Sequence, residues 1–162
     1  MAVKALVLST VLTHVLSTDP SRKVVTKPVD PEDASKGTKT EIVIDADATV
    51  FSYKPLDVFL MGYIYDRASI LSQSGDGSTD MKTRLNETNI DAVRFGVTSI
   101  ANFLEADGSN HVQFKMVKRV VNGREYDAIP DEVLIKLDAG AIGELAFKIK
   151  EASSLQKEDE KN

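Results

Sequence analysis

The spacing of apolar residues along the chain predicts four helices, because apolar side chains recur every three or four positions in each of four stretches. The first is expected over residues 57–72 and the second over residues 88–104. A short third helix is expected over residues 130–137, with proline in its first turn, and Asp138 is the expected cap of the fourth. One apolar stripe on each helix would face a shared core.

Alternating apolar and polar residues predict the strands. Residues 42–44 and 49–53 form two short strands in this interpretation, on either side of an acidic turn. Residues 112–116 alternate as well, and Asn122-Gly123 further on tolerates the positive φ angles of a type I′ turn. The sequence therefore predicts a β-hairpin over residues 112–126.

Residues 17–40 differ from the rest of the chain, because they carry three prolines among charged and small polar residues and offer almost nothing to bury. This composition predicts an extended arm or loop. A connection of this length inside a domain is usually functional or disordered. The apolar stretches on either side, residues 3–16 and 41–44, could each pair as strands.

These elements together predict a single α+β domain with a short antiparallel sheet, a hairpin in the C-terminal half, about four helices and an extended N-terminal arm. Residues 1–47 form an N-terminal strand or helix followed by the proline-rich arm, residues 48–155 form the globular domain, and residues 156–162 form a charged tail. A length of 162 residues suffices to bury one core without disulfide or metal support.

Composition restricts the chemistry. The chain has no cysteine, which excludes disulfides, thiolate metal sites and cysteine nucleophiles. Its formal net charge of -5 comes without a basic stripe, so nucleic acid is disfavoured as a partner. The apolar run over residues 5–16 is too short to span a bilayer of about 30 Å, so no membrane partner is expected.

Four groups of polar residues are candidates for catalytic, metal-binding or phosphate-binding sites. Asp45 and Asp47 fit a solvent-facing turn better than an acid–base pair. Asp76, Ser78 and Asp80 resemble the opening of a calcium loop, but the glycine required at its sixth position is missing. The histidines, His14 and His111, lack neighbouring ligands. The predicted hairpin carries four basic residues, Lys115, Lys118, Arg119 and Arg124. Such charges more often protect a strand edge from unwanted pairing than bind phosphate. We therefore expect no catalytic residue, cofactor or metal ligand, and a protein that is not an enzyme.

Ordered short motifs over roughly residues 48–162 resemble a group of small, uncharacterised bacteriophage proteins encoded among head and tail genes. The earlier motifs are Thr49-Val50-Phe51, Pro55-Leu56-Asp57, Val93-Arg94-Phe95-Gly96-Val97, Asn102-Phe103 and Ala106-Asp107-Gly108. The later ones are Phe114-Lys115, Val117-Lys118-Arg119, Gly123-Arg124-Glu125-Tyr126, Asp131-Glu132-Val133-Leu134, Glu144-Leu145-Ala146 and Glu160-Lys161-Asn162. The arm over residues 17–40 looks like an addition to this pattern.

The resemblance implies phage morphogenesis through protein–protein contacts. A virion structural component, such as a capsid decoration or head–tail protein, is the first hypothesis, and a tail assembly chaperone that is absent from the mature particle is the alternative. Its partners would be other phage structural proteins or further copies of itself, in the virion and in the host cytoplasm during assembly. The expected contact residues are Val24, Val25 and Val29 in the arm and Tyr63 and Tyr65 on the first helix.

Overall fold

Four α-helices and seven β-strands follow one another along residues 7–73 and 77–154, the parts of the chain that the computed structural model describes. The strands are β1 (Leu12–His14), β2 (Arg22–Pro28), β3 (Thr38–Ile44), β4 (Val50–Tyr53), β5 (Val97–Ala101), β6 (Val117–Val121) and β7 (Arg124–Ala128). The helices are α1 (Val58–Gln73), α2 (Gly77–Gly96), α3 (Asp131–Leu134) and α4 (Ala139–Ser153), with a short 3-10 helix, η1 (Ala34–Lys36), between β2 and β3. The predicted single α+β domain is confirmed.

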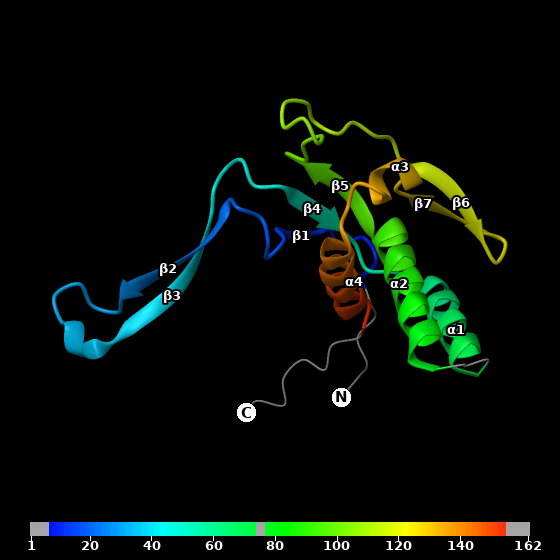
Figure 1. The fold of residues 1–162 in the computed structure, drawn as a ribbon, viewed down its shortest axis with the longest axis horizontal. Coiled ribbons are helices and arrows are strands. Elements are labelled where there is room, and N and C mark those ends of the chain that lie inside the picture. Colours follow the sequence, from blue (N-terminus) through cyan, green and yellow to red (C-terminus); the bar gives the residue numbers. More distant parts are fainter. Residues whose placement is uncertain (1–6, 74–76, 155–162) are drawn as a thin grey trace.

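The body of the molecule combines a three-stranded antiparallel sheet with a layer of helices (Figure 1). The strand order in this sheet is β1-β4-β5, and α2 packs against both α1 and α4. Side chains from the sheet and the helices form one buried cluster. Its fully buried large members are Phe51, Leu56, Ile64, Val93, Val97, Ile129, Val133, Leu145 and Ile149.

The helix predicted over residues 88–104 begins earlier, at Gly77, and ends at Gly96, and the remainder of that stretch includes the strand β5. Two causes explain the early end of the helix. Val97, Thr98 and Ile100 are β-branched and favour a strand that packs against β4. The carbonyl of Gly96 also accepts a hydrogen bond from the amide of Lys54 at 2.9 Å, so the chain has left the helical bonding pattern by this point.

The predicted hairpin is confirmed over β6 and β7, but it begins at Val117 and not at Val112. Its turn has the expected positive φ angles, 48° at Asn122 and 76° at Gly123. Val117 pairs with Ala128, the last residue of β7, and Pro130 soon follows as the N-cap of α3. Since a proline has no N–H and a helix starts there, β7 cannot extend to pair with residues 112–116.

The final helix matches the prediction. The carboxylate of Asp138 accepts a hydrogen bond from the amide of Ala141 at 2.8 Å, as an N-cap should. The predicted stripe along α4 is buried, from Ile142 to Ile149. Glu144, a charged residue of the same helix, lies beside the N-terminal strand and accepts hydrogen bonds from His14 and Ser17. The sequence offered no sign of this contact.

The arm is an antiparallel ribbon of β2 and β3 that projects away from the body (Figure 1). The stretch 41–44 therefore does form a strand, but its partner is β2, inside the segment expected to be an extended arm or loop. The N-terminal apolar stretch contributes β1, which pairs with β4. The predicted charged tail, residues 156–162, lies outside the described residues.

Candidate interaction surface

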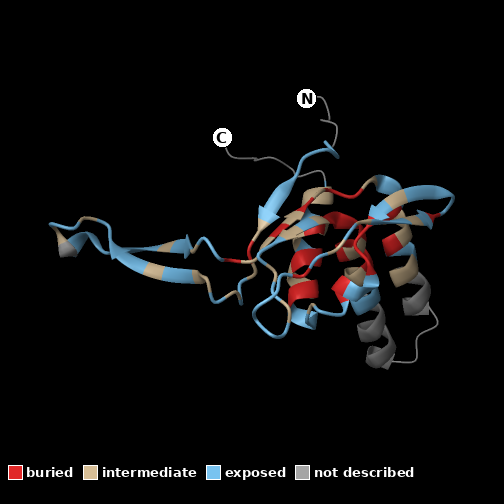
Figure 2. Ribbon diagram, turned by 90° about the horizontal axis from the view of Figure 1, so that it is seen from above, coloured by how far each residue is buried: buried red, intermediate tan, exposed pale blue. Residues whose placement is uncertain are grey.

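The projecting arm, β2 and β3, is the most exposed part of the structure (Figure 2). Its strands pair over seven positions, from Arg22 opposite Ile44 to Pro28 opposite Thr38. At about 3.3 Å per residue, each strand is about 23 Å long. Within the described residues the ribbon is a sheet of two strands, so the outer edges of both remain open.

One face of the ribbon carries a continuous set of β-branched side chains. Directly opposed residues of an antiparallel pair share a face, and alternate residues along a strand do too. The face, called the β-branched face below, consists of Val24, Thr26, Thr38, Thr40, Ile42 and Ile44, with Arg22 at its base and Pro28 at its tip. Val24 lies opposite Ile42, and their exposed fractions are 67% and 54%. Exposed aliphatic residues grouped in this way mark an interaction surface more often than scattered ones do.

The opposite face of the ribbon is ionic. Glu41 accepts contacts from two lysines, at 2.9 Å from Lys27 Nζ and 2.8 Å from Lys39 Nζ. Hydrogen bonds from Lys39 and then Lys27 lower the pKa of Glu41 to about 2. Lys23 similarly pairs with Asp45 at the base of the ribbon. The arm thus has one face suited to water and one suited to a partner.

Hydrogen bonds at the base hold the arm in a fixed direction. The carboxylate of Asp19 accepts from the amides of Ser21 at 2.8 Å and Thr49 at 2.9 Å. The side-chain amide of Asn102, which follows β5, donates to the carbonyls of Ala46 at 3.2 Å and Ala48 at 3.1 Å. Asn102 itself has a φ of 56°, a conformation that asparagine tolerates better than most residues. The direction of the arm is therefore set by contacts with the body.

The predicted contact residues fall into two separate places. Val24 lies on the β-branched face, Val25 is half-buried on the ionic face, and Val29 is 52% exposed just beyond β2. Tyr63 and Tyr65 lie on α1, on the far side of the body from the arm (Figure 1). The structure does not bring the tyrosines and the arm valines together.

Two residues of the β-branched face were missed by sequence reasoning. Ile42 and Ile44 were assigned to a strand but not considered as contacts, since an alternating strand normally buries its apolar side. Their exposed fractions are 54% and 51%, because the ribbon has no layer behind it. The clue available in the sequence was the proline-rich, polar composition of the segment that precedes them.

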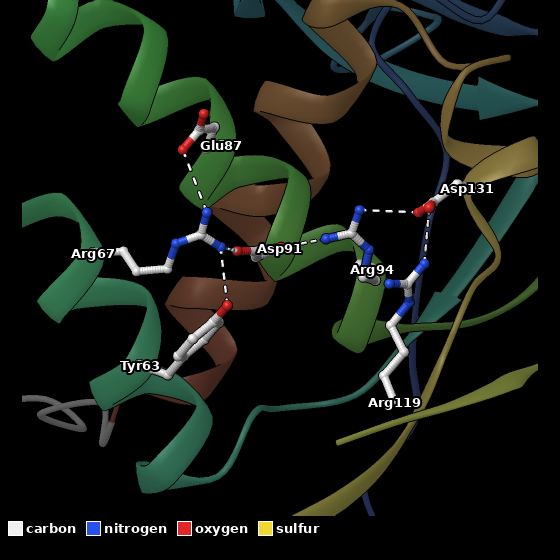
Figure 3. A network of polar contacts seen from close by, with 7 residues as sticks. All are labelled: Tyr63, Arg67, Glu87, Asp91, Arg94, Arg119 and Asp131. Carbon is white, nitrogen blue, oxygen red and sulfur yellow. Dashed lines mark hydrogen bonds and ion pairs between the residues drawn. The ribbon is translucent and has the colours of Figure 1, made fainter. Parts of the chain in front are cut away.

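Tyr63 belongs to a network of charged residues inside the body (Figure 3). The buried carboxylate of Asp91 on α2 accepts hydrogen bonds from Arg67 on α1 and from Arg94 on its own helix. Arg67 also donates to the hydroxyl of Tyr63 at 3.0 Å and pairs with Glu87 at 3.4 Å.

A second carboxylate extends the network. Asp131, at the start of α3, accepts from Arg94 at 3.0 Å and from Arg119 on β6 at 2.8 Å (Figure 3). The hydrogen bond from Arg94 is the main cause that lowers the pKa of Asp131. Alternating carboxylates and guanidiniums thereby connect α1, α2, α3 and β6. Their hydrogen bonds and ion pairs hold these four elements together.

The basic residues predicted on the C-terminal hairpin are largely engaged. Lys118 pairs with Asp127 at 2.9 Å, Arg119 pairs with Asp131, and the guanidinium of Arg124 lies 3.6 Å from the ring centre of Phe59. These three basic side chains therefore each have an acidic or aromatic partner within the fold.

Two other candidate residues from the sequence, His14 and Asp47, form hydrogen bonds within the fold. His14 binds Glu144, and Ser21 donates to Asp47 at 2.9 Å. Asp76, the start of the possible calcium loop, lies outside the described residues. Among the residues that the structure describes, no group of three His, Asp or Glu side chains could hold a metal ion. No helix in the same residues is long and apolar enough to cross a membrane.

In comparisons with known proteins, no family model, no curated protein and no solved structure matches the chain.

Proposed function

We propose that this chain is a non-enzymatic bacteriophage morphogenesis protein, a structural component of the virion that contacts neighbouring structural proteins through its arm. One observation carries the proposal. A ribbon of two strands stands out from the body with its β-branched face uncovered, while its other face is neutralised by ion pairs.

The energetic argument concerns the uncovered face. Burying apolar surface contributes about 25 cal/mol per Å² of favourable free energy. A partner that covers Val24, Ile42 and Ile44 is therefore bound more stably. Proteins that must stay monomeric place charges on such ribbons, and here most charges lie on the other face, with Arg22 at the base as the one charged residue of the β-branched face. An arm that reaches a neighbouring subunit suits a lattice protein in the virion, formed in the host cytoplasm during assembly. The resemblance of residues 48–162 to small, uncharacterised phage proteins encoded among head and tail genes supports the same class.

A tail assembly chaperone is the second candidate, favoured by a different feature. A pocket of about 420 Å³ lies between α2, α3 and α4, and its apolar lining includes Ile90, Leu134, Ile135 and Ile142. Ile135 is 82% exposed beside it. Such a pocket suits transient capture of an apolar segment of another structural protein.

Mass spectrometry of purified particles of the source phage tests the proposal. A virion component is present in many copies per particle, whereas a chaperone is abundant in the infected lysate and missing from the particle. Absence from both the particle and its assembly intermediates would overturn both candidates.

A matched pair of variants tests the arm itself. Ile42→Glu places a charge on the β-branched face, and Val43→Glu places the same charge on the neighbouring ionic face, opposite Lys23. We expect particles grown with Ile42→Glu to lose the protein and particles grown with Val43→Glu to retain it. Equal incorporation of the two variants would contradict the arm as the contact element.

A further inference from the structure

The edge of β5 opposite β4 is open. Strand β5 pairs with β4 along one side, and no strand in the described residues pairs with its other side. Beyond β5 the chain turns back: the amide of Val112 donates to the carbonyl of Phe103 at 2.8 Å, and Leu104 and His111 form an isolated bridge. The two segments that leave this bridge, β5 and residues 112–116, do not pair with each other.

Residues 112–116 have the pattern of a strand without a strand partner. Val112 is buried, Phe114 and Met116 are half-buried, and Gln113 and Lys115 between them are exposed. Pro130 and α3 prevent β7 from reaching them, as described above. A groove of about 380 Å³ separates them from β5, lined by Thr98, Ser99, Ile100, Phe103, Gln113 and Phe114, among others. The open edge of β5 therefore borders a groove, and residues 112–116 line its other side.

We propose that this groove accepts β3 from the arm of a second copy of the chain, whose open edge, on the side away from β2, adds to the open edge of β5. The proposal rests on the proposed function in one respect, since it takes the arm as the contact element. It names the partner as another copy of the same chain. Strand addition of this kind gains backbone hydrogen bonds along an open edge and side-chain contacts on alternate residues.

Charge identifies the kind of strand that fits. The residues lining the groove include no Asp, Glu, Lys or Arg, so a charged side chain buried there would find no ionic partner. The β-branched face of β3, from Thr38 to Ile44, is uncharged, and the ion pairs of Lys39 and Glu41 remain on the side that stays in water. Strand β2 fits less well, because Pro28 lacks an N–H and Lys23 and Lys27 protect its edge.

The arm of the same chain is held away from the groove. Its base is fixed by Asp19 and Asn102, and it projects outward from the body (Figure 1). Folding back onto β5 would break these hydrogen bonds, whereas insertion into another copy keeps them. Addition in trans therefore needs no rearrangement of the arm.

Engineered cysteines test the proposal cleanly, because the natural chain contains none. Full-length Ser99→Cys protein is mixed under mild oxidation with full-length variants that carry a single cysteine on β3. Ser99 is exposed on the solvent side of β5, so it should cross-link to Lys39→Cys and Glu41→Cys and not to Thr38→Cys or Thr40→Cys. Glu132→Cys, on exposed α3, reports random collision.

Sedimentation of the unmodified chain provides a second readout. We expect a dimer or larger assembly that Ile42→Glu converts to monomer and Val43→Glu leaves intact. A monomer at every accessible concentration, or cross-linking of all four arm positions at the level of Glu132→Cys, would overturn the proposal. So would protection of Ser99→Cys in particles without any cross-link to the arm, which would assign the groove to a strand of another protein. None of these three results changes whether the chain is present in particles, so failure of this proposal is distinguishable from failure of the proposed function.

Discussion

His14 Nε2 lies 2.7 Å from Glu144 Oε1, although 130 residues separate the two in the sequence. Glu144 also accepts hydrogen bonds from Ser17, at 2.9 Å from its amide and 2.6 Å from its hydroxyl. Burial raises the pKa of Glu144, but these hydrogen bonds outweigh it and the pKa falls below its ordinary value. One carboxylate of α4 thereby fastens β1 and the start of the arm to the helical layer.

Removal of that carboxylate should loosen the N-terminal strand. Glu144→Ala leaves three donors without their acceptor, and we expect the free energy of unfolding to fall by about 1–3 kcal/mol. Amide hydrogen exchange should accelerate in β1 before it does in α4. Glu151→Ala is the matched control on the same helix, because its exposed pair with Lys148 at 3.4 Å should contribute less than about 1 kcal/mol. Equal losses in the two variants would contradict the anchoring role.

The ionic face of the arm should persist in acid. The folded structure lowers the pKa of Glu41 from 4.5 to about 2, mainly through Lys39 and Lys27. A lowered pKa means that ionised Glu41 stabilises the fold above its ordinary value, and that this contribution is lost as pH falls through about 2. Carboxyl-carbon NMR shifts of Glu41 should therefore titrate well below 4.5. The double variant Lys27→Ala/Lys39→Ala should return the midpoint towards that value, and an unshifted midpoint in the natural chain would disprove the pairing.

Asp91 should be the most sensitive carboxylate of the network. Its side chain is 4% exposed and holds both Arg67 and Arg94, so Asp91→Asn removes the buried counter-charge of two guanidiniums and leaves them only their more exposed partners, Glu87 and Asp131. We expect a loss of about 3 kcal/mol in the free energy of unfolding, measured with urea. Glu87→Gln is the control, because the pair with Arg67 is half-exposed and its loss should cost under about 1 kcal/mol. A similar cost for both variants would show that burial of Asp91 does not matter.

The sequence predicted the elements that depend on local signals. Asp138 as a cap, Asn122-Gly123 as a turn and the stripe along α4 are determined within a few residues, and all three are confirmed. The prediction failed where a distant partner decides the outcome. Val97 and Ile100 fit a helical stripe equally well, and only β4, more than forty positions earlier in the chain, makes them a strand.

The candidate surface depends on pairing in the same way. Val24 and Val29 were predicted as contacts from the composition of the arm, but Ile42 and Ile44 join them only through the register of β2 with β3. The groove beside β5 was also beyond the sequence, because alternation over residues 112–116 predicts a strand and says nothing about which partner is missing. Tertiary context overrides local pattern at both places.

Gly96 should be intolerant of any side chain, because it occupies the junction where α2 ends and β5 begins. A Cβ placed there would lie 2.6 Å from Ile149 Cγ2 and 2.7 Å from its Cδ1, and Ile149 is fully buried. Gly96→Ala should therefore lower the free energy of unfolding by about 1–3 kcal/mol through overpacking.

Gly143→Ala, within α4, is the matched control for Gly96→Ala. A Cβ at Gly143 would meet nothing within 4 Å, so the better helix propensity of alanine should raise stability by about 0.5–1 kcal/mol. The double variant Gly96→Ala/Ile149→Val should lose less than the sum of its single variants in urea unfolding, since the smaller side chain relieves the contact. If Gly96→Ala instead stabilises the protein as Gly143→Ala does, Ile149 leaves room for a methyl group at this junction and the overpacking is contradicted.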